Sequence, residues 1–356
     1  MQHETTVAAM SEMAASCTSC GECVRPCSFL QQQGTPLTIA EQGTTDSNLV
    51  SAYACSLCGL CDAVCPERLS PSAMLLNMRQ EAVTLGLVDL KTYAPWLKYE
   101  KMGASPIFQR DLIPAGCSAV FFPGCSLPGT RPDAVRELFK RLQAIDPTTG
   151  LVLDCCGKIS HDLGLTERFT SLFDRLSTRL ANIGITRILT ACPGCSKILR
   201  KYGKQFEVVS VYEVLVASAP LSDFQNQNRV VTIHDPCPAR FDQSQQQAVR
   251  QLVKQCGYQV EELPSHGQTT RCCGQGGMVE GCVSGTVKQE SRIIATEAAG
   301  RTVVSSCAAC CETLSDSTPT AHIVDLLTGT EAFTTRPVSS LKRWLNRLKL
   351  RFARLT

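Results

Sequence analysis

The sequence of 356 residues has little net charge and no long apolar run, and both absences exclude whole classes of protein. Lysine and arginine exceed aspartate and glutamate by only three charges. Outside the C-terminus no basic stripe is interleaved with aromatics, so the footprint of a nucleic-acid-binding protein is missing. No stretch reaches the roughly 18 apolar residues of a membrane span. The start, MQHETTVAAMSEMAAS, lacks the basic and apolar parts of a secretory signal. We therefore expect a cytoplasmic protein.

Nucleotide-binding motifs are missing as well. A glycine-rich segment, CCGQGG at 272–277, lacks the G-x-G-x-x-G spacing after a strand that a dinucleotide-binding loop needs, and it has no P-loop lysine. We therefore expect no flavin, nicotinamide or ATP site. Two-electron flavin chemistry would then lie on another polypeptide.

Cysteine is abundant, with 22 residues. In a short secreted chain this number would indicate disulfides, but a long chain without a secretory signal is better interpreted as a metal binder. Hydrophobic residues make up 44% and charged residues 19% of the sequence, as is typical of a globular protein. The length is sufficient for two or three domains with their own cores. The spacing of the cysteines indicates which metal they bind.

Two runs of four cysteines near the N-terminus share the spacing C-x2-C-x2-C-x3-C. They read CTSCGECVRPC and CSLCGLCDAVCP. In bacterial ferredoxins three cysteines of such a run bind one [4Fe–4S] cluster and the fourth binds the neighbouring cluster. The pattern predicts two cubane clusters, one bound by Cys17, Cys20, Cys23 and Cys65 and the other by Cys55, Cys58, Cys61 and Cys27. Structural zinc, which uses two C-x2-C pairs per ion, is the alternative that two complete tandem runs disfavour.

The segments around these runs predict helices. TPLTIAEQG, DSNLVSAYAC and PSAMLLNMRQEAVTLG have helical patterns, and Ser70 or Ser72 is a suitable N-cap for the last of them. Cys27 is followed by Ser28 rather than by the proline of small ferredoxins. We therefore expect residues 1–110 to form a helical 2[4Fe–4S] ferredoxin-like domain similar to the modules of respiratory complexes.

A second cysteine pattern occurs twice in the rest of the chain. VFFPGC is similar to VTIHDPC, DCCG to RCCG, and LTACPGCSKIL to VSSCAACCETL. Each half therefore contains a lone cysteine, a Cys-Cys-Gly and a C-x2-C, which indicates a duplicated domain. The first set is Cys125, Cys155, Cys156, Cys192 and Cys195, and the second set is Cys237, Cys272, Cys273, Cys307 and Cys310.

Short apolar, β-branched runs precede most of these cysteine groups, as in SAVFFPGC, LVLDCC and RVVTIHDPC, and helical segments alternate with them. This alternation predicts two α/β domains with mainly parallel sheets, at residues 115–220 and 228–328. Ligands at the carboxyl ends of parallel strands converge on one crevice. We therefore expect each five-cysteine set to gather at the edge of its sheet.

The five-cysteine sets resemble the CCG cysteine-rich domain of heterodisulfide reductase, and the order of the parts is similar to the fused D-type subunit of that enzyme. Iron–sulfur subunits of glycolate, lactate and anaerobic glycerol-3-phosphate dehydrogenases share this layout. The resemblance implies an α+α/β fold, a helical dicluster module followed by a duplicated α/β CCG domain. It implies a noncubane [4Fe–4S] cluster at each set, with Cys155, Cys156, Cys272 and Cys273 catalytic if the protein cleaves disulfides. Zinc at a CCG site is the alternative, because the motif determines the ligands and not the metal.

Together these features predict the iron–sulfur electron-transfer subunit of a multi-subunit, heterodisulfide-reductase-like oxidoreductase. Its expected partners are a flavoprotein dehydrogenase or electron-transfer flavoprotein subunit and a membrane cytochrome b or quinone-reactive subunit. The alternatives are a catalytic disulfide reductase acting at the noncubane clusters and a zinc-binding assembly scaffold. One departure from the family is Pro238, which follows Cys237 where relatives often have histidine.

Some residues near these patterns have simpler interpretations. Cys117, Cys256, Cys282 and Cys311 lie outside the patterns and are expected to be small buried hydrophobic residues. His234, close to Cys237, is interpreted as a structural histidine bonded to the backbone, with a proton donor as the alternative.

Residues 329–356 are predicted to form a linker and a basic amphipathic helix. No acidic residue follows Glu331. The apolar residues expected near one stripe of the helix are Leu341, Trp344, Leu345, Leu348, Phe352 and Leu355. Such a helix suits an anionic membrane surface, here the inner face of the cell membrane, or a groove on a partner. Docking on its own domain is the third interpretation.

Overall fold

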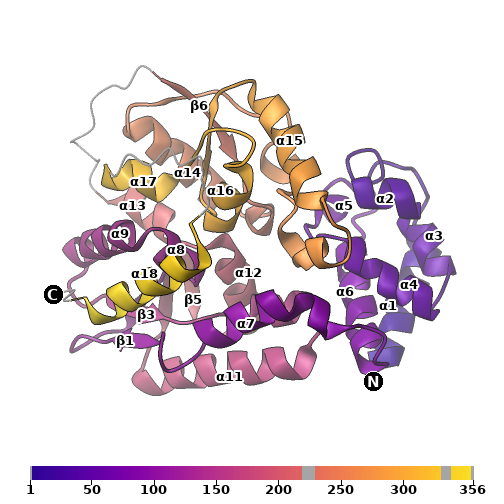
Figure 1. Ribbon diagram of the computed structural model, residues 1–356, viewed down its shortest axis with the longest axis horizontal. Coiled ribbons are helices and arrows are strands. Elements are labelled where there is room, and N and C mark those ends of the chain that lie inside the picture. Colours follow the sequence, from indigo (N-terminus) through magenta and orange to yellow (C-terminus); the bar gives the residue numbers. More distant parts are fainter. Residues whose placement is uncertain (1, 219–228, 330–337, 354–356) are drawn as a thin grey trace.

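The computed structural model describes residues 2–218, 229–329 and 338–353 (Figure 1). A group of helices at one side of the molecule is formed by the N-terminal region, and two sheets covered by helices form the other side. Most of the predicted linker and Leu355 lie outside the described residues. No helix of the described segments is long and apolar enough to cross a membrane.

The N-terminal part consists of short helices packed around one apolar core. These helices are α1 (Gln2–Ser16), α2 (Ser28–Gln33), α3 (Pro36–Glu41), α4 (Asp46–Ser51), α5 (Leu60–Ala63), α6 (Pro71–Thr84) and α7 (Ala94–Gly103). Proline occupies the first position of α3 and α6, where no backbone N–H is needed. Leu30, Ile39, Leu49 and Met78 are almost completely buried between the helices.

The start of α6 differs in detail from the predicted cap. Ser70 occupies the N-cap position, but its side chain makes no capping bond. Instead, the Asp62 carboxylate accepts hydrogen bonds from the backbone N–H and the hydroxyl of Ser72. A carboxylate from α5 therefore accepts a hydrogen bond from a free backbone N–H group in the first turn of α6. This bond holds the second cysteine run against α6.

The first sheet has five strands in the order β1-β3-β2-β4-β5. These strands are β1 (Arg110–Leu112), β2 (Ala119–Phe122), β3 (Gly150–Leu153), β4 (Arg187–Thr190) and β5 (Glu207–Ser210). β1 pairs antiparallel with β3, and all other pairs are parallel. The helices of this part are α8 (Ser126–Thr130), α9 (Pro132–Ile145), α10 (Lys158–Asp162), α11 (Thr166–Ile183), α12 (Pro193–Tyr202) and α13 (Val211–Ala217).

The second sheet has four parallel strands in the order β7-β6-β8-β9. They are β6 (Val230–His234), β7 (Gln259–Val260), β8 (Thr302–Ser305) and β9 (Thr320–His322). Its helices are α14 (Gln243–Gln255), α15 (Thr286–Ala298), α16 (Ala308–Leu314) and α17 (Ile323–Thr328). Both sheets are thus mainly parallel, as the β-branched runs predict, and the order β3-β2-β4-β5 of the first matches that of the second.

The two sheets share one hydrophobic core. Phe121 of β2, Leu138 of α9, Ile233 of β6, Leu252 of α14 and Leu327 of α17 all belong to a single buried cluster. Helices α13 and α14 pack together, as do α9 and α17, so the helices of one half cover those of the other. The relative position of the two sheets is therefore determined by apolar packing.

Helix α18 (Ser340–Phe352) is docked on the protein itself, along α8 and α9. Its Trp344 ring packs against Phe108, with 4.6 Å between centroids, and Arg347 is buried and donates a hydrogen bond to the Gly103 carbonyl. The predicted apolar stripe is not the face that docks, because Leu341 and Phe352 are exposed while Trp344 packs against Phe108. The docked face consists of the Trp344 ring, the buried Arg347 side chain and Leu350, which belongs to the shared core.

One buried arginine joins the three parts of the molecule. The Arg79 side chain, which has no exposed surface, donates hydrogen bonds to carbonyls of its own region and to those of Asp162 and Gly277. Gly164, at φ +78°, lies directly against the Arg79 backbone, and a Cβ there would lie 2.7 Å from the Arg79 carbonyl carbon. The contact between the helical part and the first sheet's part therefore requires glycine at this position.

Replacing Gly164 by alanine should destabilise this contact. The left-handed backbone costs an alanine about 1 kcal/mol, and the clash with Arg79 should raise the total loss in the free energy of unfolding to about 3 kcal/mol. Gly184→Ala is the matched control, since Gly184 has φ +89° and open space around its Cβ position. Denaturant unfolding of both variants measures the difference. Equal losses would show that the close approach to Arg79 does not contribute.

Candidate metal centres

The cysteines of the first predicted cubane line one pocket. Cys17, Cys20, Cys23 and Cys65 surround it, together with apolar side chains such as Met13 and Pro36. Burial, followed by the nearby Cys17 thiolate, raises the pKa of Cys23 to about 11. In the metal-free protein this thiol is therefore protonated at neutral pH, and iron binding would have to release its proton.

The cysteines of the second predicted cubane line a separate pocket. Cys27, Cys55, Cys58 and Cys61 lie around it, and Cys272 of the second CCG motif also reaches its wall. Burial raises the pKa of Cys55 to about 12, again favouring the protonated thiol when no metal is bound. Gly59, at φ +70°, makes the turn from which α5 begins and brings Cys58 and Cys61 to the same pocket.

The five cysteines of the first CCG motif come together at the carboxyl ends of β2, β3 and β4. The Cys125 thiol neighbours Cys155, and the Cys195 thiol neighbours Cys156 and Cys192. A Cβ on Gly124 would lie 2.9 Å from the Cys192 Cβ, so this glycine at φ +79° lets the ends of β2 and β4 approach. The adjacent pair Cys155–Cys156 thus reaches two different neighbours within one set.

The five cysteines of the second CCG motif also come together. Cys237 Sγ lies 4.0 Å from Cys272 Sγ, and Cys273 Sγ lies 3.3 Å from Cys310 Sγ. The Cys310 thiol also neighbours Cys307. The adjacent pair of this set, Cys272–Cys273, therefore links the lone cysteine to the C-x2-C, in the same arrangement as the first set.

The second cubane set and the second CCG set are in direct contact. The Cys58 and Cys272 side chains line the same pocket, and the interaction with Cys272 is the largest cause that raises the pKa of Cys58. The sequence did not predict this contact, because the two residues lie far apart in the chain and in separate motifs. Their spacing carries no signal for it.

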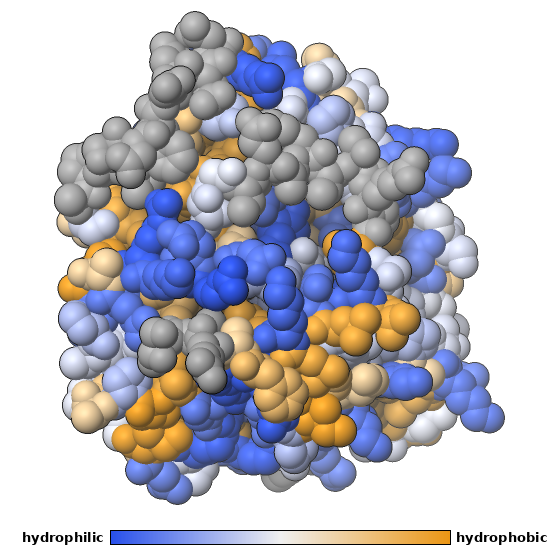
Figure 2. Space-filling model, turned by 60° about the vertical axis from the view of Figure 1, so that its left-hand side comes forward, coloured by the Kyte–Doolittle hydropathy of each residue, from blue (hydrophilic) through white to orange (hydrophobic). Residues whose placement is uncertain are grey.

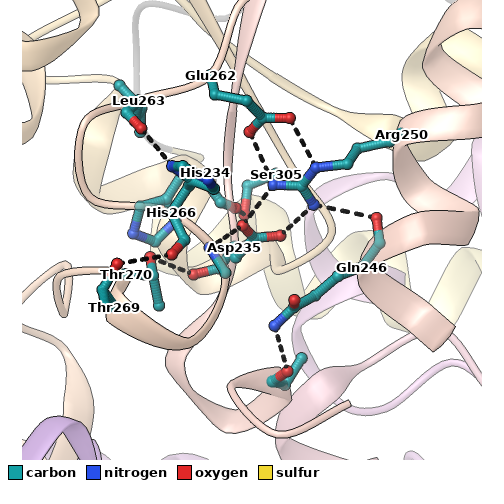
Figure 3. Close-up of polar contacts among 12 residues, drawn as sticks. His234, Asp235, Gln246, Arg250, Glu262, Leu263, His266, Thr269, Thr270 and Ser305 are labelled. Atoms are coloured by element: carbon teal, nitrogen blue, oxygen red, sulfur yellow. Dashed lines mark hydrogen bonds and ion pairs between the residues drawn. The ribbon is translucent and has the colours of Figure 1, made fainter. Parts of the chain in front are cut away.

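A polar network positions the loops that carry Cys237 and Cys272 (Figure 3). Arg250 donates two hydrogen bonds of 2.8 Å to the Asp235 carboxylate and is also bonded to Glu262. Asp235 in turn accepts a hydrogen bond from the Gly267 N–H, and the Thr270 hydroxyl donates to the Asp235 carbonyl. These bonds tie the end of β6 to the segment just before Cys272.

His234 belongs to the same network. Its Nε2 lies 3.1 Å from the Arg271 carbonyl oxygen, and its own carbonyl accepts a hydrogen bond from the Ser305 hydroxyl. The side chain is buried. This backbone bond agrees with the structural interpretation of His234, since its Nε2 is engaged in holding the residue before Cys272.

A cleft of about 490 Å³ lies where the three parts meet. Its wall includes Cys58 from the helical part, His161 and Lys197 from the first sheet's part, and Cys237 and Pro238 from the second. Close to it, Lys158 forms an ion pair with Asp162. Burial lowers the pKa of Lys158, but Asp162 and the thiolates of Cys237 and Cys156 outweigh it and leave the pKa raised. Lys158 therefore places a positive charge near both CCG sets.

The four remaining cysteines do not all match their prediction. Cys256 and Cys311 are buried, as expected of small hydrophobic residues. Cys311 donates to the carbonyls of Ser305 and Ala321 rather than joining the neighbouring set. The prediction is wrong for Cys282, which is exposed, and Cys117 is only half-buried. Cys282 lies on a surface turn, a placement that a lone cysteine in a sequence does not reveal.

The donor chemistry of the four sets fits iron–sulfur clusters, because each set offers only thiols around an enclosed space. Among the described residues, no three cysteine, histidine or acidic side chains are already arranged to hold a metal ion. Binding would therefore require the thiols of a set to turn toward the bound group.

Two families match the regions that contain these sets. Residues 13–69 match the family described as 4Fe-4S dicluster domain, and residues 119–200 and 231–315 each match the cysteine-rich domain family called CCG. The chain thus contains one region similar to 4Fe-4S dicluster domains and two similar to CCG cysteine-rich domains. Its 4Fe-4S dicluster domain and its two CCG matches account for all four cysteine sets.

Three relatives are similar over different shares of the chain. In Methanothermobacter marburgensis, the subunit designated B of fumarate reductase (CoM/CoB) is 28% identical over 64% of this chain and 49% of its own length. In Methanosarcina mazei, the subunit designated D of dihydromethanophenazine:CoB–CoM heterodisulfide reductase is 24% identical over 83% of this chain and 87% of its own. The EtfAB:quinone oxidoreductase of Syntrophomonas wolfei is 26% identical over 47% of this chain and 24% of its own. The chain thus spans about half of the first relative.

The positions of the extra cysteines predict their reactivity. In the metal-loaded protein at alkaline pH, iodoacetamide should modify Cys282, which is exposed. It should spare Cys256, because burial raises the pKa of that thiol to about 12 and removes the reactive thiolate. Peptide mass spectrometry before and after unfolding measures both. Modification of Cys256 in the folded protein would contradict its placement in the core.

Proposed function

We propose that the chain is an iron–sulfur electron-transfer subunit of a multi-subunit oxidoreductase related to heterodisulfide reductase. The observation that carries this proposal is that Cys58 and Cys272 line one pocket. It brings a ferredoxin-type set and a CCG set to one boundary, so that no stretch of protein separates them. Electron transfer between clusters requires such proximity, whereas a structural zinc scaffold does not.

The proposed ligands follow from the pockets and thiol contacts. The first cubane would be held by Cys17, Cys20, Cys23 and Cys65, and the second by Cys27, Cys55, Cys58 and Cys61. Each five-cysteine set would hold a noncubane [4Fe–4S] cluster, because five thiols with an adjacent pair exceed the four that zinc takes. The clusters supply one-electron redox chemistry, and the protein's part is to hold them in a row and shield them.

The proposed domains are the ferredoxin-like residues 1–110, the CCG domains at 115–220 and 228–328, and the tail at 329–356. Support for a duplication comes from the strand orders β3-β2-β4-β5 and β7-β6-β8-β9, which correspond strand for strand. The lone cysteine and the C-x2-C follow corresponding strands in both halves, β2 and β6 for the former and β4 and β8 for the latter.

The proposed partners are a flavoprotein, as donor or acceptor, and a membrane quinone or cytochrome b protein. Support for the first is the similarity to an EtfAB:quinone oxidoreductase, and support for the second is the similarity to part of a dihydromethanophenazine-linked reductase. Cys20 is exposed, so the first cubane set would be the point nearest to a docked partner.

A second candidate function is disulfide reduction within this chain. The observation that favours it is the cleft of about 490 Å³, which has Cys237 in its wall and Lys158 close by. A disulfide substrate in the cleft would reach the second CCG set, and the Lys158 ammonium could neutralise a thiolate product. The residues at the reacting centre would be Cys155, Cys156, Cys272 and Cys273.

Metal content tests the proposed cofactors. Anaerobically purified protein should contain about 16 irons per chain from four four-iron clusters. Cys273→Ala should lower this to about 12 and leave the EPR signals of the reduced cubanes unchanged, while Cys256→Ala should keep about 16. About eight irons with two zincs in the unmodified protein would overturn the noncubane assignment and favour the scaffold.

The tail helix is proposed to attach the protein to the inner face of the cell membrane. The face of the molecule that carries α18 shows hydrophobic side chains among strongly hydrophilic ones (Figure 2). Leu341, Leu345 and Phe352 of α18 are 71%, 55% and 74% exposed. Lys342 and Lys349 are exposed beside them. Exposed apolar residues next to lysines suit an anionic lipid surface.

Replacing Leu341, Leu345 and Phe352 together by glutamine should weaken binding to vesicles of phosphatidylcholine and phosphatidylglycerol by about tenfold or more, because their apolar surface no longer enters the lipid. These side chains are mostly exposed, so the fold should persist. Leu85→Gln, at an exposed leucine of the helical part, is the control. Co-sedimentation measures binding. If the unmodified protein does not bind vesicles, the face belongs to a protein partner.

A further inference from the structure

Three arginines, Arg79, Arg240 and Arg347, are buried without an ion pair in the described part of the chain, and the first two lie beside the second cubane set. Arg79 is 0% and Arg240 1% exposed, and both guanidinium groups donate to backbone carbonyls. In the described segments neither of these two forms an ion pair, whereas Arg131, whose side chain is 9% exposed, is paired with Asp325. Burying a charge without a counter-charge costs free energy, so a negative group close to either arginine would stabilise the fold.

Both guanidinium groups lie against the second cubane set. Arg79 donates to the carbonyl of Cys55, and Arg240 Nε lies 3.1 Å from the carbonyl of Cys58. Burial raises the pKa of Cys55, and the Arg79 charge partly opposes this rise. Arg240 acts on Cys58 in the same direction. Each guanidinium group therefore lies beside the backbone of one predicted ligand, and its charge stabilises the thiolate form of that ligand.

Other charged groups near the second cubane set do not cancel the positive charges of Arg79 and Arg240. Arg271 lines the pocket, but its charge is balanced by Glu290 at 3.3 Å. Asp62 lies beside Cys61 and contributes one negative charge. Two unpaired arginines and one aspartate leave a net positive charge around the second set.

The first cubane set has no buried charge in the wall of its pocket, as far as the described residues show. Glu67 is the charged residue that lines it, and this side chain is exposed. Arg25, which lies in the loop between Cys23 and Cys27, is mostly exposed and is paired with Glu22. Solvent and this pairing screen its charge. The two sets thus have the same ligands and different electrostatic environments.

We propose that Arg79 and Arg240 set the reduction potential of the second cubane above that of the first, so that electrons pass inward from the first set to the second and collect beside Cys272. Reduction adds one negative charge to a cluster, and a buried positive charge stabilises that state. One electron leaves the first cluster, which is oxidised, and enters the second, which is reduced, without transfer of a proton. This inference rests on the proposed cubane ligands and adds the direction of electron flow.

The test is an EPR-monitored reductive titration of the full-length, cluster-loaded protein with dithionite. Arg240→Gln should decrease the reduced-to-oxidised ratio of the second cubane about tenfold at a fixed potential, which corresponds to about 59 mV for one electron. Arg240→Lys keeps the positive charge, so the reduction potential of the second cubane should stay close to that of the unmodified protein. Arg25→Gln, beside the first set but exposed, should change neither cluster.

The unmodified protein provides a second measurement that needs no arginine variant. Its two cubanes should titrate separately, and Cys20→Ser should alter the signal of the lower-potential one. Equal potentials, the reverse order, or an unchanged second cubane in a cluster-loaded Arg240→Gln would each overturn the inference. The absence of cubane signals in the unmodified protein would instead overturn the proposed function.

Discussion

The arrangement of the three parts depends on the burial of the Arg79 side chain. Its guanidinium is held by carbonyls from the helical part, from the Asp162 segment and from the Gly277 segment, so each part supplies hydrogen-bond acceptors that would otherwise be left unpaired. Gly164 and Gly277 provide the space for this contact. The same contact brings the second cysteine run close to the second CCG motif, which makes a short path between two sets of thiols possible.

Much of the site could be predicted from the sequence because metal ligands follow local rules. The spacing of each ferredoxin run, the adjacent pair Cys155–Cys156 and the placement of cysteines after β-branched runs are all properties of short segments. They predict which thiols gather, and the structure brings those thiols together. The contact of Cys58 with Cys272 could not be predicted, since it depends on how whole parts pack and on a buried arginine that has no motif of its own.

The tail shows a different limit of sequence patterns. Hydrophobicity alone places Leu341, Trp344 and Leu345 near one stripe, yet α18 turns Trp344 inward and leaves the two leucines in solvent. The reason is that the surface beneath it offers the Phe108 and Tyr99 rings and the Gly103 carbonyl, which suit an indole and a guanidinium better than two leucines. A helical pattern shows which residues are apolar. It does not show which face of the helix packs against the rest of the protein.

The common core of the two sheets has a consequence for how such proteins diverge. Leu138, Ile233 and Leu252 belong to one core that contains residues of both halves, so each half stabilises the other whatever the cysteines bind. Selection for metal ligation can therefore be relaxed in one half while selection for its shape persists. Proteins in which one half has lost its metal ligands would therefore keep both sheets. The two halves would remain similar in fold although only one of them binds a metal.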